Sequence, residues 1–129
     1  FATVYDEHNF AHVKEMENEV VFSDLKSIEE ANKKAFLKVT RTEESLQSLG
    51  KDIQTEIPGA KIEDTDKAFG KNRDSAIFFS YIQNEGRKGE IYLCEHNEFT
   101  YRIEISCTKN DSSLWGQLQM MVDEFYFVD

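Results

Sequence analysis

The chain has 129 residues, of which 40% are hydrophobic and ten are phenylalanine, and its formal net charge is −10. This apolar content is enough for a packed core and argues against disorder, and with one proline and six glycines no segment has linker composition, so we expect residues 1–129 to form a single domain. The charge disfavours nucleic acid and anionic membrane surfaces as partners, and no apolar run approaches the roughly 20 residues of a transmembrane helix.

Alternating side chains predict short strands in the first part of the chain. Phe1–Tyr5 is expected to form a strand followed by a polar turn. Two further strand pieces, His12–Val13 and Val20–Phe22, are separated by the acidic stretch Glu15–Glu19. Ser27-Ile28-Glu29-Glu30 has the form of a capping box, which fits one helical turn or a loop.

A strand and then a helix are predicted next. Ala35–Val39 alternates and is expected to be extended. Thr40-Arg41-Thr42-Glu43 offers a capping box for the helix, and Pro58-Gly59 ends it. Apolar residues at helical spacing form the buried stripe of this helix: Leu46, Leu49, Ile53 and Ile57.

The second half of the chain predicts four strands. Lys61–Phe69 is polar enough for an edge strand, whereas Ser75–Gln83 is apolar on both faces and belongs inside a sheet. Glu90–Glu95 and Phe99–Cys107 form a hairpin that turns at about Asn97. In the last strand one face is polar, and we expect it to be wet or covered by polar contacts: Thr100, Arg102, Glu104 and Ser106.

The chain closes with an amphipathic helix. Asn110-Asp111-Ser112 supplies the N-cap, and Leu114–Phe125 carries an apolar stripe. Runs of strands interrupted by single helices predict an α+β fold, an antiparallel sheet with helices packed on it.

The two cysteines indicate the redox state of the compartment in which the protein works. In the predicted hairpin, Cys94 and Cys107 are on the order of 20 Å apart, too far for a disulfide. We therefore expect free thiols, which favour a reducing compartment such as the cytoplasm. The chain begins at Phe1 rather than Met, so we also expect an upstream segment, and a leader there would make the protein exported or lipid-anchored.

The sequence contains only weak matches to metal-binding and catalytic motifs. His8 and His12 would be roughly 13 Å apart on a strand, too far to share a metal. Glu63–Asp66 departs from a calcium loop because Ala68 and Phe69 occupy its later positions. Cys94 and His96 share a strand face at about 7 Å, beyond hydrogen-bond reach. We therefore expect no catalytic residue, no metal and no cofactor.

The order of these elements resembles the PsbP-like fold. The features that carry the likeness are the opening aromatic strand Phe1–Tyr5, the strand ending Val20-Val21-Phe22, the two-sided strand Ala76–Tyr81 and the closing helix that ends Asp123-Glu124-Phe125-Tyr126-Phe127. That fold is shared by the extrinsic photosystem II protein, a nuclear-import factor that binds the GTPase Ran, and many small bacterial proteins of unknown function. The resemblance implies a non-enzymatic scaffold that binds proteins. The family's Pro and Trp after the first strand are absent, and Asp6–Phe10 stands in their place.

Three functional hypotheses follow. The first is a non-enzymatic module that binds a protein partner, and a basic partner fits the charge best. The second is a small-ligand binder or enzyme with a pocket between the sheet and the closing helix, lined by Tyr81, Tyr92, His96, Tyr101 and Arg102. The third is an immunity- or inhibitor-type protein that neutralises a basic toxin. The oligomeric state is left open by the sequence.

Overall fold

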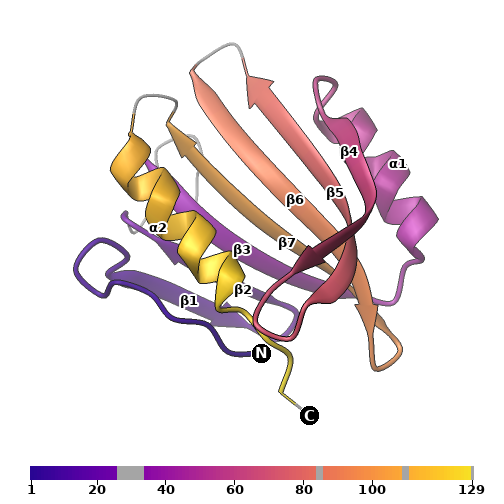
Figure 1. The fold of residues 1–129 in the computed structure, drawn as a ribbon, viewed down its shortest axis with the longest axis horizontal. Coiled ribbons are helices and arrows are strands. Elements are labelled where there is room, and N and C mark those ends of the chain that lie inside the picture. Colours follow the sequence, from indigo (N-terminus) through magenta and orange to yellow (C-terminus); the bar gives the residue numbers. More distant parts are fainter. Residues whose placement is uncertain (26–33, 84–85, 109–110, 129) are drawn as a thin grey trace.

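The computed structural model describes residues 1–25, 34–83, 86–108 and 111–128. Its strands form one seven-stranded antiparallel sheet in the order β1-β2-β3-β7-β6-β5-β4, and two helices pack on this sheet (Figure 1). The predicted α+β architecture is therefore confirmed. The element bounds are β1 His12–Met16, β2 Glu19–Ser23, β3 Ala35–Thr42, α1 Leu46–Glu56, β4 Lys61–Phe69, β5 Asp74–Gln83, β6 Arg87–His96, β7 Phe99–Thr108 and α2 Ser112–Asp123.

The sheet curves around α2, which lies across its inner face (Figure 1). Asp111 caps this helix by accepting a hydrogen bond from the Leu114 amide, as the sequence predicts. The predicted apolar stripe forms the main core with alternate residues of β3, β6 and β7. Four residues of the stripe are at most 2% exposed: Leu118, Met121, Val122 and Phe125.

Helix α1 covers the other face of the sheet over β5 and β6. Its apolar stripe packs against Phe79, Ile91 and Leu93. The helix ends where predicted, because Ile57 is the C-cap directly before Pro58-Gly59. Strand β5 therefore carries core residues on both faces, Ala76 on one and Phe79 on the other, as its two-sided apolar pattern predicts, whereas Ile82 is 63% exposed. The two helices thus lie on opposite faces of the sheet.

Two turns, β6–β7 and β4–β5, contain residues with positive φ. Asn97 and Glu98 both have positive φ, which suits the two-residue turn between β6 and β7. Gly70 has φ +75° at the β4–β5 turn, where a Cβ atom would collide with the Phe125 carbonyl oxygen. Lys71 then donates its amide to that carbonyl at 2.8 Å, so the turn is tied to the end of α2.

The structure corrects three local predictions. The capping box at Thr40–Glu43 does not start a helix, because β3 stays paired with β7 as far as Thr42 and Ser45 is the N-cap. Phe1–Tyr5 is not a strand, although Ala2 forms an isolated bridge with Tyr126. The acidic stretch Glu15–Glu19 is not a spacer, since β1 and β2 use most of it.

The two cysteines lie as predicted. Cys94 faces Tyr101 across the hairpin, and Cys94 and Cys107 are both buried free thiols. The capping-box prediction at Ser27–Glu30 lies outside the described residues. Within the described part of the chain, neither helix is long and apolar enough to cross a membrane.

Candidate functional site

The five residues predicted to line a pocket are divided between the two faces of the sheet. Tyr81 and Arg102 lie on the α1 face, whereas Tyr92, His96 and Tyr101 lie on the α2 face among the main core residues. The interface that was expected to hold the pocket is filled by the buried stripe of α2. The structure therefore brings these five side chains into two separate groups.

On the α1 face, Tyr81 and Arg102 meet at the buried carboxylate of Glu104. The Tyr81 hydroxyl donates to Glu104 Oε2 at 2.7 Å, and Arg102 Nη2 donates to Oε1 at 2.8 Å. Arg102 also reaches α1 through an ion pair with Glu56 at 3.0 Å. This network, Tyr81–Glu104–Arg102–Glu56, connects α1 to the sheet, and within it only Arg102 Nε is buried without a hydrogen-bond partner.

Burial and charge shift the pKa values in this network. Burial, with a smaller contribution from Glu104, raises the pKa of Tyr81. Burial alone would lower the pKa of Arg102, but the carboxylates of Glu104 and Glu56 raise it. Tyr81 therefore stays neutral and Arg102 stays charged at ordinary pH, which fits a structural role.

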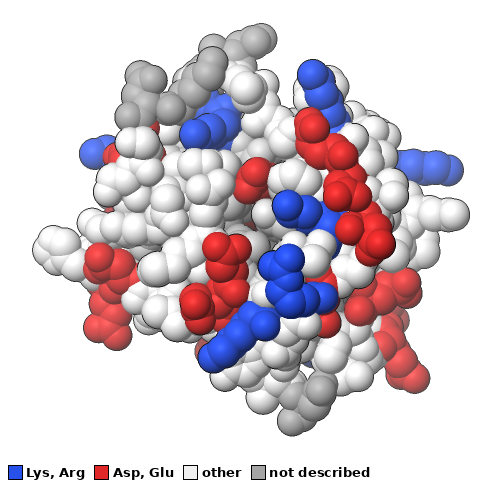
Figure 2. Space-filling view, viewed as in Figure 1, with Lys and Arg blue, Asp and Glu red and all other residues white. Residues whose placement is uncertain are grey.

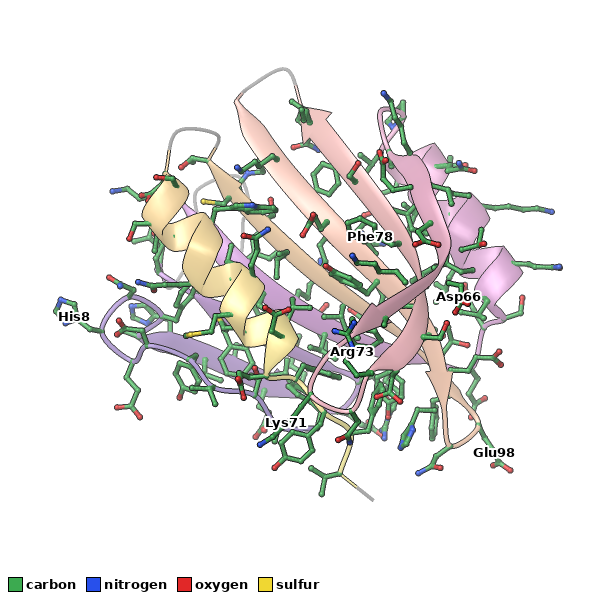
Figure 3. All side chains as sticks on the ribbon, viewed as in Figure 1. His8, Asp66, Lys71, Arg73, Phe78 and Glu98 are labelled. Carbon is green, nitrogen blue, oxygen red and sulfur yellow. The ribbon has the colours of Figure 1, made fainter. Side chains whose placement is uncertain are left out.

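On the α2 face, the three predicted side chains pack against other rings. Tyr92 lies 4.9 Å from Phe78 between ring centroids, and Figure 3 shows Phe78 between α2 and β4. His96 stacks on Phe127 at 4.2 Å, and Tyr101 contacts the same ring at 4.7 Å. These contacts cover the end of the core where the chain leaves α2.

An open groove lies instead beside the β1–β2 hairpin. Its volume is about 680 Å³, which falls in the range of ligand and peptide sites. The residues that line it come from the N-terminal segment and from the hairpin: Phe1, Ala2, Thr3, Val13, Glu15, Met16, Glu17, Val20 and Phe22.

The N-terminal wall of the groove is held by contacts with the end of α2. Ala2 exchanges backbone hydrogen bonds with Tyr126 at 2.9 and 3.0 Å, and the Thr3 hydroxyl donates to the Met121 carbonyl. The Phe1 ring stacks on Phe125 at 5.0 Å. This wall is therefore fixed in place although it has little regular secondary structure.

The floor and far wall come from the hairpin. Val13 pairs with Phe22, and Glu15 pairs with Val20, so these four side chains point to the same face of the sheet. Phe22 is buried, whereas Val13 is 45% exposed. The groove therefore has an apolar floor and an exposed apolar rim.

The charged groups of the groove are acidic. Glu15 and Glu17 both line it. The nearby Arg41 donates to the Glu17 carbonyl and the Asn18 side chain, and so holds the hairpin turn. Figure 2 shows mostly acidic and uncharged surface at the left below α2, with basic side chains at the lower centre.

This groove is not among the sites predicted from the sequence. The signal was present in part, since Val13 and Glu15 alternate with the same period as Val20 and Phe22 around a polar Asn18 turn. The position of Phe1 against Phe22, 6.4 Å between ring centroids, depends on long-range packing that no local pattern shows.

No metal centre is formed within the described ranges, where no group of three or more His, Cys, Asp or Glu side chains could hold an ion. Comparison of the chain with protein-family models, curated proteins and solved structures finds no match.

Proposed function

We propose that this protein is a binding module that captures a basic, partly apolar segment of another protein in the groove beside the β1–β2 hairpin. The observation that carries the proposal is the combination of an apolar floor with two lining carboxylates, Glu15 and Glu17. A lysine or arginine beside an apolar side chain matches this surface in both charge and polarity.

The surrounding charge supports the same partner. The chain carries 25 acidic and 15 basic residues, so the field of the whole molecule attracts cationic segments before contact. Charged groups at an open groove act mainly on the association rate and are screened by salt. Binding should therefore weaken as ionic strength rises.

Selection from a displayed library of random peptides tests the proposal. We expect the enriched peptides to combine Lys or Arg with aliphatic or aromatic residues, and their affinity to fall by at least about tenfold for a Glu15→Lys/Glu17→Lys variant. Enrichment of acidic peptides, or no enrichment at all, would contradict the proposal.

A matched charge reversal distinguishes the groove from general acidity. Glu43→Lys/Asp52→Lys changes the net charge by the same amount at exposed positions before and on α1. We expect this control to alter affinity by less than about threefold, since it acts only through the screened long-range field. Equal losses in the two variants would assign binding to net charge alone.

The other hypotheses stay predictions. The contacts of Tyr81, Tyr92, His96, Tyr101 and Arg102 described above are with neighbouring protein groups, and none of them favours a small ligand. An immunity-type role is a special case of binding a basic partner, and it would use the same groove. The resemblance to the PsbP-like fold is in keeping with a binding scaffold.

A further inference from the structure

The two edges of the sheet differ in how they are protected from further pairing. Strand β4 forms one edge, and its pairing with β5 has register shifts between Ile62 and Asp64 and between Asp64 and Lys67. It also carries a series of charged residues, Asp66 among them (Figure 3). Bulges and charges are the usual means of blocking an edge strand.

Strand β1 forms the other edge, and although it carries Lys14 and Glu15 it has no bulge. Its pairing with β2 runs without a shift from His12↔Ser23 to Met16↔Glu19. Val13 and Met16 remain 45% and 44% exposed. Among the strands of the described residues, only β2 pairs with β1. Alternate N–H and C=O groups of β1 therefore face away from the sheet.

The free edge of β1 and the groove belong to one surface. Val13 and Glu15 line the groove and also lie on the edge strand. A chain that paired with β1 would place every second side chain on the groove side of the sheet. We propose that the partner segment binds in an extended conformation as an eighth strand on β1, with its basic side chains on the groove side beside Glu15 and its apolar side chains on the other side, where Lys14 and Met16 lie. This inference rests on the proposed function.

Charge selects the occupant of this edge. Two copies of the chain could also pair through β1, but a two-fold arrangement centred on Lys14 would place the two Lys14 side chains opposite each other. Like charges directly opposite are destabilising, and each copy carries a net charge of −10. A basic segment of a different protein avoids both penalties when its basic side chains lie on the groove side, on the face opposite to Lys14, so the occupant is an extended cationic segment rather than a second copy.

N-methylated peptides test strand addition directly. The probe is a capped peptide of about seven residues in which lysine and valine alternate, long enough to overlap the five residues of β1. Two methylated forms carry N-methyl groups on either the lysine or the valine amides. In an antiparallel pair, the N–H groups of alternate residues point toward the partner strand, so either the lysine amides or the valine amides face β1, but not both. We expect one methylated peptide to lose at least about tenfold in affinity and the other to bind within about threefold of the parent.

The outcomes separate this inference from the proposed function. If the unmethylated peptide binds through the groove and the two methylated peptides bind with equal affinity, strand addition is wrong while groove binding stands. If the parent peptide does not bind, or binds equally to the Glu15→Lys/Glu17→Lys variant, the proposed function itself is contradicted. Slower amide hydrogen exchange at alternate residues of β1 on adding the parent peptide is a second expected result.

Sedimentation tests the other occupant. We expect the chain without peptide to sediment as a monomer over a wide concentration range. A dimer that the lysine–valine peptide dissociates would overturn the inference and assign the edge to a second copy.

Discussion

Glu104 shows how a single buried charge is accommodated in this sheet. It is 4% exposed and accepts hydrogen bonds from Tyr81 and Arg102. The Tyr81 ring reaches Glu104 because it lies over Gly89, its partner on β6, where a Cβ atom would collide with the ring. Gly89 is therefore the residue that allows this hydrogen bond.

Gly89→Ala tests this arrangement. The added methyl must displace Tyr81 from Glu104, so we expect a loss of about 1–3 kcal/mol in the free energy of unfolding. Gly116→Ala is the matched control, because apart from its chain neighbours and the backbone of α2 itself no atom lies within 4 Å of its Cβ position, and a helical alanine should stabilise by up to about 1 kcal/mol. Equal effects of the two changes in chemical denaturation would show that the Tyr81 ring does not depend on Gly89.

Glu90 should make the free energy of unfolding depend on pH. Burial raises its pKa, opposed by the Tyr92 hydroxyl and by Lys67 and Lys88, while Asp123 adds to the rise. The folded state then binds the proton more tightly than the unfolded state. This group therefore lowers the free energy of unfolding as the pH rises above the pKa of glutamate in the unfolded chain, about 4.3.

We therefore expect Glu90→Gln to raise the free energy of unfolding at pH 7 relative to the parent, and to have a smaller effect near pH 4. Urea denaturation at the two pH values measures this difference. A variant that is destabilised more at pH 7 than at pH 4 would mean that the charged form of Glu90 is favoured in the fold.

At the scale of elements, Arg102 connects helix α1 to strand β7. It pairs with Glu104, whose side chain is 5% exposed, and with Glu56, whose side chain is 57% exposed. Glu56 ends α1, where a carboxylate is unfavourable for the helix dipole, and Arg102 offsets this. The two partners should therefore differ greatly in importance.

Arg102→Met should lower the free energy of unfolding by about 3–5 kcal/mol, because it leaves Glu104 buried without its cation. Glu56→Gln should change it by less than about 1 kcal/mol, since its ion pair is largely exposed. The double variant Arg102→Met/Glu104→Leu should recover much of the loss, because no buried charge remains. If thermal or chemical denaturation shows no recovery, the cost lies in packing rather than in charge.

For the whole molecule, the sequence predicts the sheet and its covering helices well. The alternation in Phe99–Cys107 and the cap at Asp111 are local signals, and both are confirmed. The capping box at Thr40–Glu43 misled because strand pairing to Thr42 outweighs a local helix signal. The polar face of β7 is expected to be wet or covered, and it is covered, since Thr100, Glu104 and Ser106 are at most 4% exposed.

The candidate groove was beyond such local analysis. It depends on which residues share a face across strands and on contacts such as Phe1 with Phe125, which join opposite ends of the chain. The division of Tyr81 and Tyr92 between two faces follows from the same β5–β6 register, which the residue types alone do not reveal. Surfaces assembled from distant segments require the three-dimensional structure.

The most direct test of the central claim is the affinity of the lysine–valine peptide for three proteins, measured side by side at low salt: the parent chain, Glu15→Lys/Glu17→Lys and Glu43→Lys/Asp52→Lys. The account predicts that the groove variant loses at least about tenfold in affinity while the α1-side variant stays within about threefold of the parent. Equal affinities for the two variants would contradict it, because the groove would then contribute nothing beyond the net charge.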